Sequence, residues 1–313
     1  MDKEIEIQFD DINEGDCFEK IKLIKDKSID LIVTSPPYAD KRKRFYDSVH
    51  PNKYVEWFMP LSEELKRVLK PKGSFILNIK EHPRDGERDT YVLELILSLK
   101  KSGWFWIEEY CWYKKNSFPG KWPNRFRDAW ERCLHFSLDK RFNMYQDAVK
   151  VPIGDWSKKR FKSMSENDFI RHVSETNGTL GRNVSNWLDR TTVYPHNVIV
   201  LEEEHYLNKQ DDKIAEVPNI LEFATVCFNK KHSAAFPLEL PSWFILLLTK
   251  KGDVVFDPFI GSGTTAVAAK LLSRHYIGIE KDIQFVSDAK KSLDEIQIIK
   301  SKSKIKINSN EKK

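Results

Sequence analysis

An apolar segment that ends in a double proline constrains the fold of this chain more than any other feature. Residues 30–38 read DLIVTSPPY. The mostly β-branched apolar run predicts a buried strand. Proline fixes its own φ and keeps the preceding residue extended, so Pro36 and Pro37 predict a stiff turn where the chain leaves the sheet. The turn presents the Ser35 hydroxyl, the Pro36 carbonyl and the Tyr38 ring. Two acceptors beside an aromatic face suit a flat heterocycle that carries an amino group.

A second strand-like segment runs into a glycine-containing loop. Residues 253–265 read DVVFDPFIGSGTT, and the strong helix formers AVAAKLL follow. Strand, glycine loop and helix form the plan of a nucleotide-type site, because glycine permits a tight turn and the helix start offers free N–H groups. The loop lacks the third glycine of the dinucleotide fingerprint and the Gly-Lys-Ser/Thr of a P-loop. The next strand-like segment, residues 275–280, ends in Glu280, whose carboxylate suits ribose hydroxyls.

These two loops resemble motifs of the amino-methyltransferases of DNA. In that family a polar residue, Pro-Pro and an aromatic residue form the catalytic motif, and DPFxGSGTT is close to the S-adenosylmethionine loop. Residues 231–237, KHSAAFP, resemble a third motif, usually His-Pro-Ala-x-Phe-Pro, with Ser233 in place of the usual proline. The order of catalytic motif, recognition region and cofactor motif resembles that of the beta group, whose members look like circular permutations of one fold. The resemblance implies methyl transfer from S-adenosylmethionine to an exocyclic amino nitrogen of a DNA base.

The resemblance also implies roles for individual residues. Ser35, Pro36, Pro37 and Tyr38 form the catalytic turn, in which Ser35 Oγ and the Pro36 carbonyl accept from the target amino group. Tyr38 stacks on a base that is flipped out of the duplex. The implied cofactor-binding residues are Asp16, Lys231, His232, Ser233, Phe236, Asp257, Pro258, Phe259, Gly261, Ser262, Gly263, Thr264, Thr265 and Glu280. Family members with serine in the first position act mostly on cytosine N4, which favours that target here.

The succession of elements predicts an α/β fold with a doubly wound, mainly parallel, Rossmann-like sheet that is circularly permuted. Residues 54–69 and 90–101 have apolar residues at helical spacing, whereas residues 74–79, 104–112 and 131–137 read as strands. Alternation of strands and helices implies right-handed crossovers. Ligands of such sheets bind beyond the carboxyl ends of the strands, near the topological switch point. The two loops are therefore expected to face each other at one edge.

The α/β rhythm is interrupted in the middle of the chain. Residues 138–229 contain basic and polar stretches with scattered aromatic residues, and the segment is too long for a simple loop. We interpret it as an inserted target-recognition region. Residues 1–137 are then the catalytic half of the methyltransferase domain, and residues 230–297 are its cofactor-binding half. Residues 298–313 are rich in Lys, Ser and Asn and predict a basic, flexible tail.

The charge distribution favours double-stranded DNA as a partner. The net charge of +5 is only mildly basic, but a basic run follows the catalytic turn, where a phosphate backbone would pass. Aromatic and basic residues are interleaved in residues 112–116 and 125–131, which resemble a family segment near the target base. The expected DNA-binding residues are Lys41, Arg42, Lys43, Arg44, Lys114, Asn116, Arg125 and Arg127. The family also implies a cognate restriction endonuclease, and the chain is expected to be a monomer or a homodimer.

Several other classes of protein do not fit the sequence. The cysteines form no CxxC pair or Cys/His cluster, so neither a metal nor a disulfide framework is expected. No apolar run is long enough to span a membrane, and the acidic start has no secretory core, so a reducing cytoplasm is expected. No cysteine follows a proline, as cytosine C5 chemistry would require. The alternative enzymatic functions are methylation of adenine N6, of RNA or of a protein amide. A further alternative is a catalytically inactive DNA-binding subunit, and the intact motifs argue against it.

Overall fold

The protein divides into two compact units. The computed structural model describes residues 7–39, 49–84, 86–114, 125–126, 128–163, 170–171, 182–183, 191–200 and 236–310. The larger unit comprises residues 1–144 and 197–313, and the smaller unit comprises residues 145–196. The larger unit therefore combines the two ends of the chain, and it contains both loops that the sequence predicts for the site.

The larger unit is built on a sheet of eight strands in the order β1-β14-β13-β2-β3-β7-β6-β12. The first five strands of this order run parallel, β7 is antiparallel to its neighbours β3 and β6, and β12 is parallel to β6. This confirms the predicted α/β fold with a mainly parallel sheet. The strands are β1 (Asp11–Glu14), β2 (Ile29–Thr34), β3 (Leu69–Ile79), β6 (Phe105–Tyr113), β7 (Trp130–Ser137), β12 (Val198–Val200), β13 (Val254–Asp257) and β14 (His275–Glu280).

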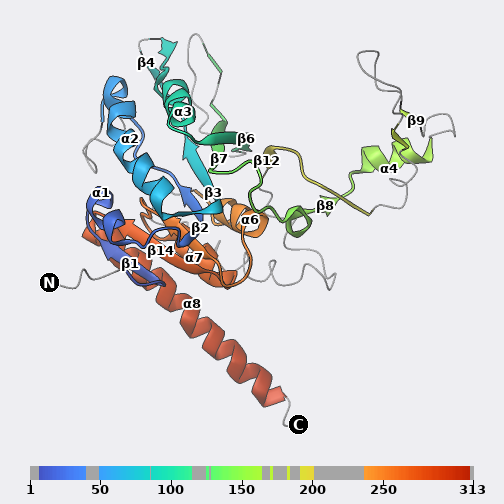
Figure 1. Ribbon diagram of the computed structural model, residues 1–313. Helices are drawn as coiled ribbons and strands as arrows, with labels where there is room; N and C mark the ends of the chain where they lie inside the picture. Colours follow the sequence, from blue (N-terminus) through green and yellow to red (C-terminus); the bar gives the residue numbers. More distant parts are fainter. Residues whose placement is uncertain are drawn as a thin grey trace. The chain divides into compact units, whose positions relative to one another are not determined.

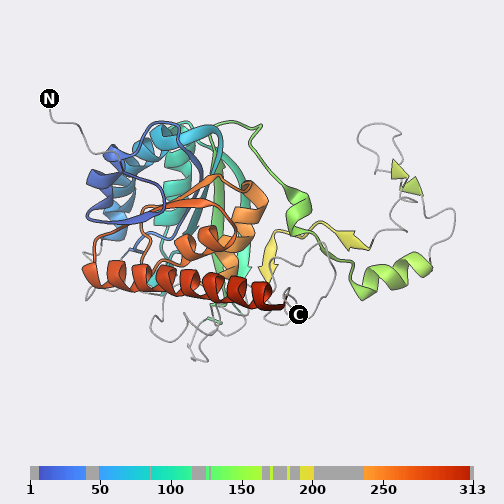
Figure 2. The same ribbon diagram turned by 90° about the horizontal axis from the view of Figure 1, so that it is seen from below.

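Helices cover both faces of this sheet (Figures 1 and 2). Two of them, α2 (Pro51–Val68) and α3 (Tyr91–Lys101), pack against each other on one face, next to the short α1 (Cys17–Lys20) and a 3-10 turn, η1 (Ile21–Leu23). The others, α6 (Glu239–Leu248), α7 (Thr264–Leu271) and α8 (Ile283–Asn310), contact one another in sequence on the opposite face. A small hairpin, β4 (Pro83–Arg84) and β5 (Glu87–Arg88), precedes α3.

Local sequence explains the central elements. All residues of β2 are buried, as expected for a parallel strand covered on both faces. Helix α2 starts where the His50 side chain accepts from the N–H of Asn52 and Pro51 occupies the first turn. Its apolar residues recur at helical spacing, so one stripe faces the core. The fully buried members of that stripe are Tyr54, Phe58, Leu61, Leu65 and Val68.

Two segments differ from the sequence prediction. Strand β3 already begins at Leu69, which pairs with Ile29, so it starts earlier than the strand predicted over residues 74–79. A salt bridge of 2.7 Å between Lys70 Nζ and Asp30 Oδ2 holds this start, next to a shift in the β2–β3 register. Helix α8 continues to Asn310, where the composition predicts an irregular tail. Residues 283–310 contain no proline or glycine that would end the helix earlier.

The smaller unit contains short elements. They are the 3-10 turn η2 (Gln146–Val149), the helix α4 (Asp155–Lys162) and the strands β8 (Val151–Pro152), β9 (Ile170–Arg171), β10 (Arg182–Asn183) and β11 (Thr192–Val193). β8 pairs with β11 and β9 pairs with β10, both antiparallel. Lys158, Lys159, Arg160 and Lys162 of α4 are exposed. In the part of the chain that the structure describes, no helix is long and apolar enough to cross a membrane.

Candidate active site

Four neighbouring parallel strands carry predicted site residues at their carboxyl ends. These strands are β1, β14, β13 and β2 in the order of the sheet. Asp16 follows β1, Glu280 ends β14, and β13 runs into the glycine loop, residues 258–263. The catalytic turn, residues 35–38, follows β2. The chain order reverses between β13 and β2, which makes this position the topological switch point, where ligands of open α/β sheets bind.

A buried carboxylate joins the two loops directly. Asp257 Oδ1 accepts from the Thr34 hydroxyl at 2.6 Å, although the two residues are 223 positions apart. Asp257 Oδ2 accepts from the Thr265 hydroxyl at 2.7 Å, and Oδ1 also accepts from the Phe259 N–H at 3.0 Å. Burial raises the pKa of Asp257 to about 6, against the opposing effect of the hydroxyl donors. Asp257 therefore ties the residue before the catalytic turn to the glycine loop and the start of α7.

A tyrosine of helix α2 anchors the catalytic turn. The Tyr54 hydroxyl donates to the Pro37 carbonyl at 2.9 Å. Tyr54 itself is fully buried, and its ring centroid lies 4.7 Å from that of Tyr91. Pro36 is buried, whereas Ser35 and Pro37 are partly exposed. The turn is thus fixed by a core residue while its serine still reaches the surface.

Tyr38 is held through its hydroxyl. This hydroxyl donates to Glu131 Oε2 at 2.8 Å, and Asn78 Oδ1 lies 3.3 Å away. Ser35 Oγ donates to Tyr38 Oη at 3.4 Å. Burial, followed by the charge of Glu131, raises the pKa of Tyr38 well above its ordinary value. Tyr38 is therefore a neutral hydrogen-bond donor, and Glu131 at the start of β7 belongs to the site.

The glycine loop needs its glycines for two different reasons. Gly261 and Gly263 have φ values of +53° and +90°, in the left-handed region that favours glycine. A Cβ atom on Gly263 would lie 2.8 Å from the Cβ of Ala289 in α8. A Cβ atom on Gly261 would meet nothing within 4 Å, so this side of the loop is open. Gly263 thus permits close packing of α8, and Gly261 leaves room for a ligand.

We expect Gly263→Ala to lower the free energy of unfolding by about 2–5 kcal/mol, because it adds overpacking against Ala289 to the cost of the left-handed conformation. The matched control is Gly261→Ala, which has the conformational cost alone and should lower the free energy of unfolding by about 1–2 kcal/mol. Chemical denaturation of both variants measures the difference. Equal losses would show that α8 moves away without cost.

Glu280 fixes the other side of the loop. Its Oε2 accepts from the Gly261 N–H at 2.9 Å and its Oε1 accepts from the Asp282 N–H at 2.9 Å. The Glu280 carbonyl accepts from the Gly15 N–H at 2.9 Å, next to Asp16. Burial raises the pKa of Glu280, and the backbone donors oppose this effect. Each carboxylate oxygen has a further lone pair, so the group can still accept from a ligand hydroxyl.

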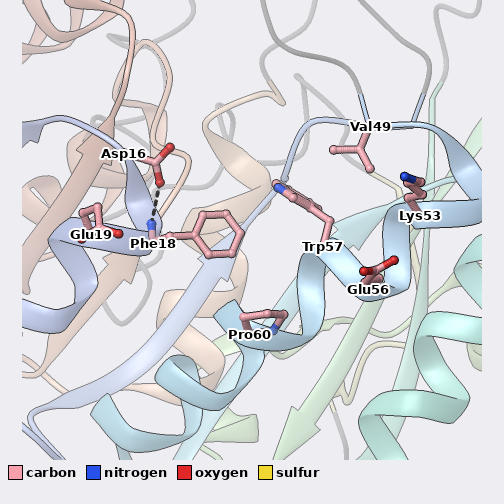
Figure 3. Close-up of a pocket in the computed structure, with 8 residues that line it drawn as sticks. All are labelled: Asp16, Phe18, Glu19, Val49, Lys53, Glu56, Trp57 and Pro60. Atoms are coloured by element: carbon pink, nitrogen blue, oxygen red, sulfur yellow. Dashed lines mark hydrogen bonds between the residues drawn. The ribbon is translucent and has the colours of Figure 1, made fainter.

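A pocket with an aromatic wall opens beside these loops (Figure 3). Its volume is about 760 Å³. The rings of Phe18 and Trp57 point toward each other and form an edge-to-face pair in its wall, with centroids 5.6 Å apart. The ring centroid of Phe259, in the glycine loop, lies 6.0 Å from that of Trp57. The Asp16 side chain caps α1 by accepting from the Phe18 N–H at 2.9 Å. The lining residues are Asp16, Phe18, Glu19, Val49, Lys53, Glu56, Trp57 and Pro60.

A cluster of charges lies at the end of β3. Lys80, which is buried, donates to Asp128 Oδ1 at 2.5 Å and lies over the Trp130 ring at 4.2 Å. Burial lowers the pKa of Lys80, and the bond to Asp128 opposes this effect. Arg132 pairs with Glu81 and Glu109. We call Lys80, Glu81, Arg88, Glu109, Asp128 and Arg132 the β3-end cluster.

Sequence reasoning missed several residues around the site. Asn78 and Glu131 lie at the ends of β3 and β7 and bond to Tyr38 of the catalytic turn, and Asn78 also donates to the Arg132 carbonyl of the β3-end cluster. Ligands of parallel sheets bind beyond the carboxyl ends of the strands, so the polar residues that follow the apolar run of β3 could have indicated this part of the site. Phe18 and Trp57 carried no such signal, because aromatic residues at helical spacing read as core.

Three further groups of predicted site residues can be described. Asp257 and Thr265 are each 1% exposed and bond to each other, so the structure gives them a supporting position inside the loop. Lys114 pairs with Glu131 and lies over the Trp112 ring at 4.8 Å, and Arg125 is exposed. The predicted residues outside the described part of the chain are Lys41, Arg42, Lys43, Arg44, Asn116, Arg127, Lys231, His232 and Ser233.

Comparison with known protein sequences gives a consistent result. The sequence model of a family described as DNA methylase matches residues 29–291. The chain is 29% identical over 283 residues to the Type II methyltransferase M.PvuII of Proteus hauseri, which covers 87% of this chain and 80% of that protein. It is 30% identical over 276 residues to the orphan methyltransferase M.BamHII of Bacillus amyloliquefaciens, covering 86% of this chain and 90% of that protein.

Solved structures share the fold. The cytosine-N4-specific PvuII DNA methyltransferase superposes with a TM-score of 0.62 at 24% identity, covering 90% of this chain and 85% of that chain. The complex of M1.HpyAVI with SAM superposes with a TM-score of 0.50 at 21% identity, covering 90% of this chain and 98% of that chain. At these identities the comparisons establish the α/β methyltransferase fold.

Proposed function

Because this chain belongs to the DNA methylase family, whose sequence model matches residues 29–291, we propose that it transfers a methyl group from S-adenosylmethionine to the N4 amino group of a cytosine in duplex DNA. The observation that carries the proposal is the position of the catalytic turn. It lies at the topological switch point, joined to the glycine loop by the Thr34–Asp257 hydrogen bond of 2.6 Å. A base held by the turn would thus lie beside a methyl donor held by the loop.

The residues around the glycine loop fit the methyl donor. Gly261 leaves an open surface, and the Glu280 carboxylate next to it can accept from ribose hydroxyls. The pocket next to these groups offers Asp16 and an aromatic wall to the adenine ring. When bound, the donor supplies an activated methyl group on a sulfonium. The remaining predicted cofactor residues, including Phe236, Pro258, Ser262 and Thr264, stay part of this proposal.

We expect Trp57→Ala to weaken binding of S-adenosylmethionine about 10- to 100-fold, because loss of an aromatic wall costs about 1–3 kcal/mol of stacking. Calorimetric titration without DNA measures this affinity. The control is Trp106→Ala, which removes a tryptophan that is 39% exposed and lies on β6. Equal affinity of parent and Trp57→Ala would place the adenine ring elsewhere.

The catalytic turn fits an exocyclic amino group. The lone pair of such a nitrogen is conjugated with the ring, so acceptors at its N–H bonds make it a better nucleophile. Ser35 Oγ and the Pro36 carbonyl are the proposed acceptors, and the Tyr38 ring is the proposed stacking face. The target base must leave the duplex to reach them, at a cost of a few kcal/mol. Serine in the first position, together with the similarity to M.PvuII, supports cytosine N4 as the target.

Duplex DNA is the proposed substrate, and two further points belong to the proposal. The exposed Arg125 and the exposed basic residues of α4 support contacts with phosphates. A cognate restriction endonuclease is supported by relatives that are Type II methyltransferases, although M.BamHII is an orphan. A cytoplasmic location is supported by the free thiols of Cys17, Cys111 and Cys133.

Labelled S-adenosylmethionine tests the function directly. The protein is incubated with duplex DNA of varied sequence, and the DNA is digested to nucleosides that are separated and counted. We expect the label in N4-methylcytosine. Label in N6-methyladenine would overturn the choice of base. Label in RNA or protein, with none in DNA, would overturn the choice of substrate.

A further inference from the structure

We propose that Glu131 is the terminal acceptor of a proton relay that starts at Ser35 and passes through Tyr38. Glu131 would then be a positioning residue for methyl transfer, because it acts on the target amino group through two hydroxyls. The inference rests on the proposed function, since it concerns the fate of the protons of the target amino group. It also explains how a serine can serve where a carboxylate would be the stronger acceptor.

The hydrogen bonds form a chain with one direction. Ser35 Oγ donates to Tyr38 Oη at 3.4 Å, and the Tyr38 hydroxyl donates to Glu131 Oε2 at 2.8 Å. Because the Ser35 hydroxyl hydrogen points toward Tyr38, the lone pairs of Ser35 Oγ are available to an incoming N–H. The Ser35–Tyr38 distance is long, as hydrogen bonds of catalytic groups often are before substrate binds. Hydrogen bonds arranged in series polarise one another, so the carboxylate strengthens Ser35 as an acceptor.

The surroundings suit Glu131 as the end of the chain. Its side chain is 13% exposed and its other oxygen, Oε1, pairs with Lys114. Asn78 Oδ1 is also near the Tyr38 hydroxyl, at 3.3 Å. An amide oxygen accepts a hydrogen bond but does not take up a proton near neutral pH, so Asn78 can only orient Tyr38. The titratable groups that face Glu131 are Tyr38, Lys80, Tyr91, Lys114 and Cys133.

The relay balances the methyl transfer. As the N–C bond forms, the C–S bond of the donor breaks and its electron pair stays on sulfur, which leaves the positive charge on nitrogen. The amino nitrogen passes one proton to Ser35 Oγ, and Ser35 passes its hydroxyl proton to Tyr38 Oη. Tyr38 passes its proton to Glu131 Oε2. Both hydroxyls end neutral, and the carboxylate ends as a carboxylic acid that later releases the proton to solvent.

Single-turnover methylation of DNA, with enzyme in excess, tests the relay. We expect Glu131→Gln and Tyr38→Phe each to slow methyl transfer about 10- to 100-fold. The double variant should be no slower than the slower single variant, because both changes break the same chain. The affinities for DNA and S-adenosylmethionine should stay within about twofold. The matched control is Glu108→Gln, which removes an exposed carboxylate on β6 outside the β3-end cluster and should leave the rate unchanged.

The pH dependence gives a readout that a structural role would not change. The single-turnover rate should depend on pH differently in the parent and in Glu131→Gln, because the variant has no carboxylate at the end of the relay. An unchanged rate in Glu131→Gln, or multiplying losses in the double variant, would overturn the relay. A parent protein that places no label on DNA would instead overturn the proposed function.

Discussion

Ser35→Ala is expected to lower the rate of methyl transfer about 10²- to 10³-fold while leaving the affinity for S-adenosylmethionine unchanged. Ser35 lies after β2 and the glycine loop lies after β13, so removal of the hydroxyl leaves the cofactor side intact. The loss reflects the missing acceptor for the target amino group. Single-turnover methylation measures the rate, and calorimetric titration measures the affinity.

Ser28→Ala is the control for this variant. Ser28 also carries a hydroxyl that bonds within a turn, donating to the Lys25 carbonyl at 2.7 Å, but it lies at the opposite end of β2. Its rate should match that of the parent. A rate in Ser35→Ala within about threefold of the parent would show that Ser35 does not act on the amino group.

Asp257→Ala is expected to lower the free energy of unfolding by about 3–5 kcal/mol. The change removes the shared acceptor of the Thr34 and Thr265 hydroxyls and of the Phe259 N–H, and it leaves the two buried hydroxyls without this acceptor. Denaturant unfolding followed by circular dichroism measures the loss. Asp253→Ala is the control, because its carboxylate accepts from an exposed N–H, that of Lys250 at 2.7 Å.

The ionisation of Asp257 predicts a further effect of pH. Burial raises its pKa from 3.8 to about 6, so the folded protein binds this proton more tightly than the unfolded chain. The stabilisation that this proton gives the folded protein is fully present below the pKa of Asp257 in the unfolded chain. It is lost as the pH rises through about 6. Relative to the Asp257→Asn variant, the parent should therefore lose up to about 3 kcal/mol of unfolding free energy between about pH 4 and about pH 7. A constant difference would contradict the raised pKa.

Local patterns predicted the elements of the fold well. The strand before the catalytic turn, the strand before the glycine loop and the strand that ends in Glu280 all lie where their apolar runs predict them. Burial on both faces produces such runs, so they are visible in the sequence. The early start of β3 was not predictable, because it depends on the pairing of Leu69 with Ile29 of β2 and is followed by turn-forming residues at 70–73.

The sequence by itself determined where the turn and the loop of the candidate site lie, because proline and glycine at fixed offsets restrict the backbone wherever they occur. Only the tertiary structure decided how the loops are connected and supported. The Thr34–Asp257 bond, the contact of Tyr38 with Glu131 and the ring pair of Phe18 and Trp57 each join residues from different elements. The order of the strands sets these contacts. Strand order depends on packing of the whole sheet and leaves no trace in the spacing of residues along the chain.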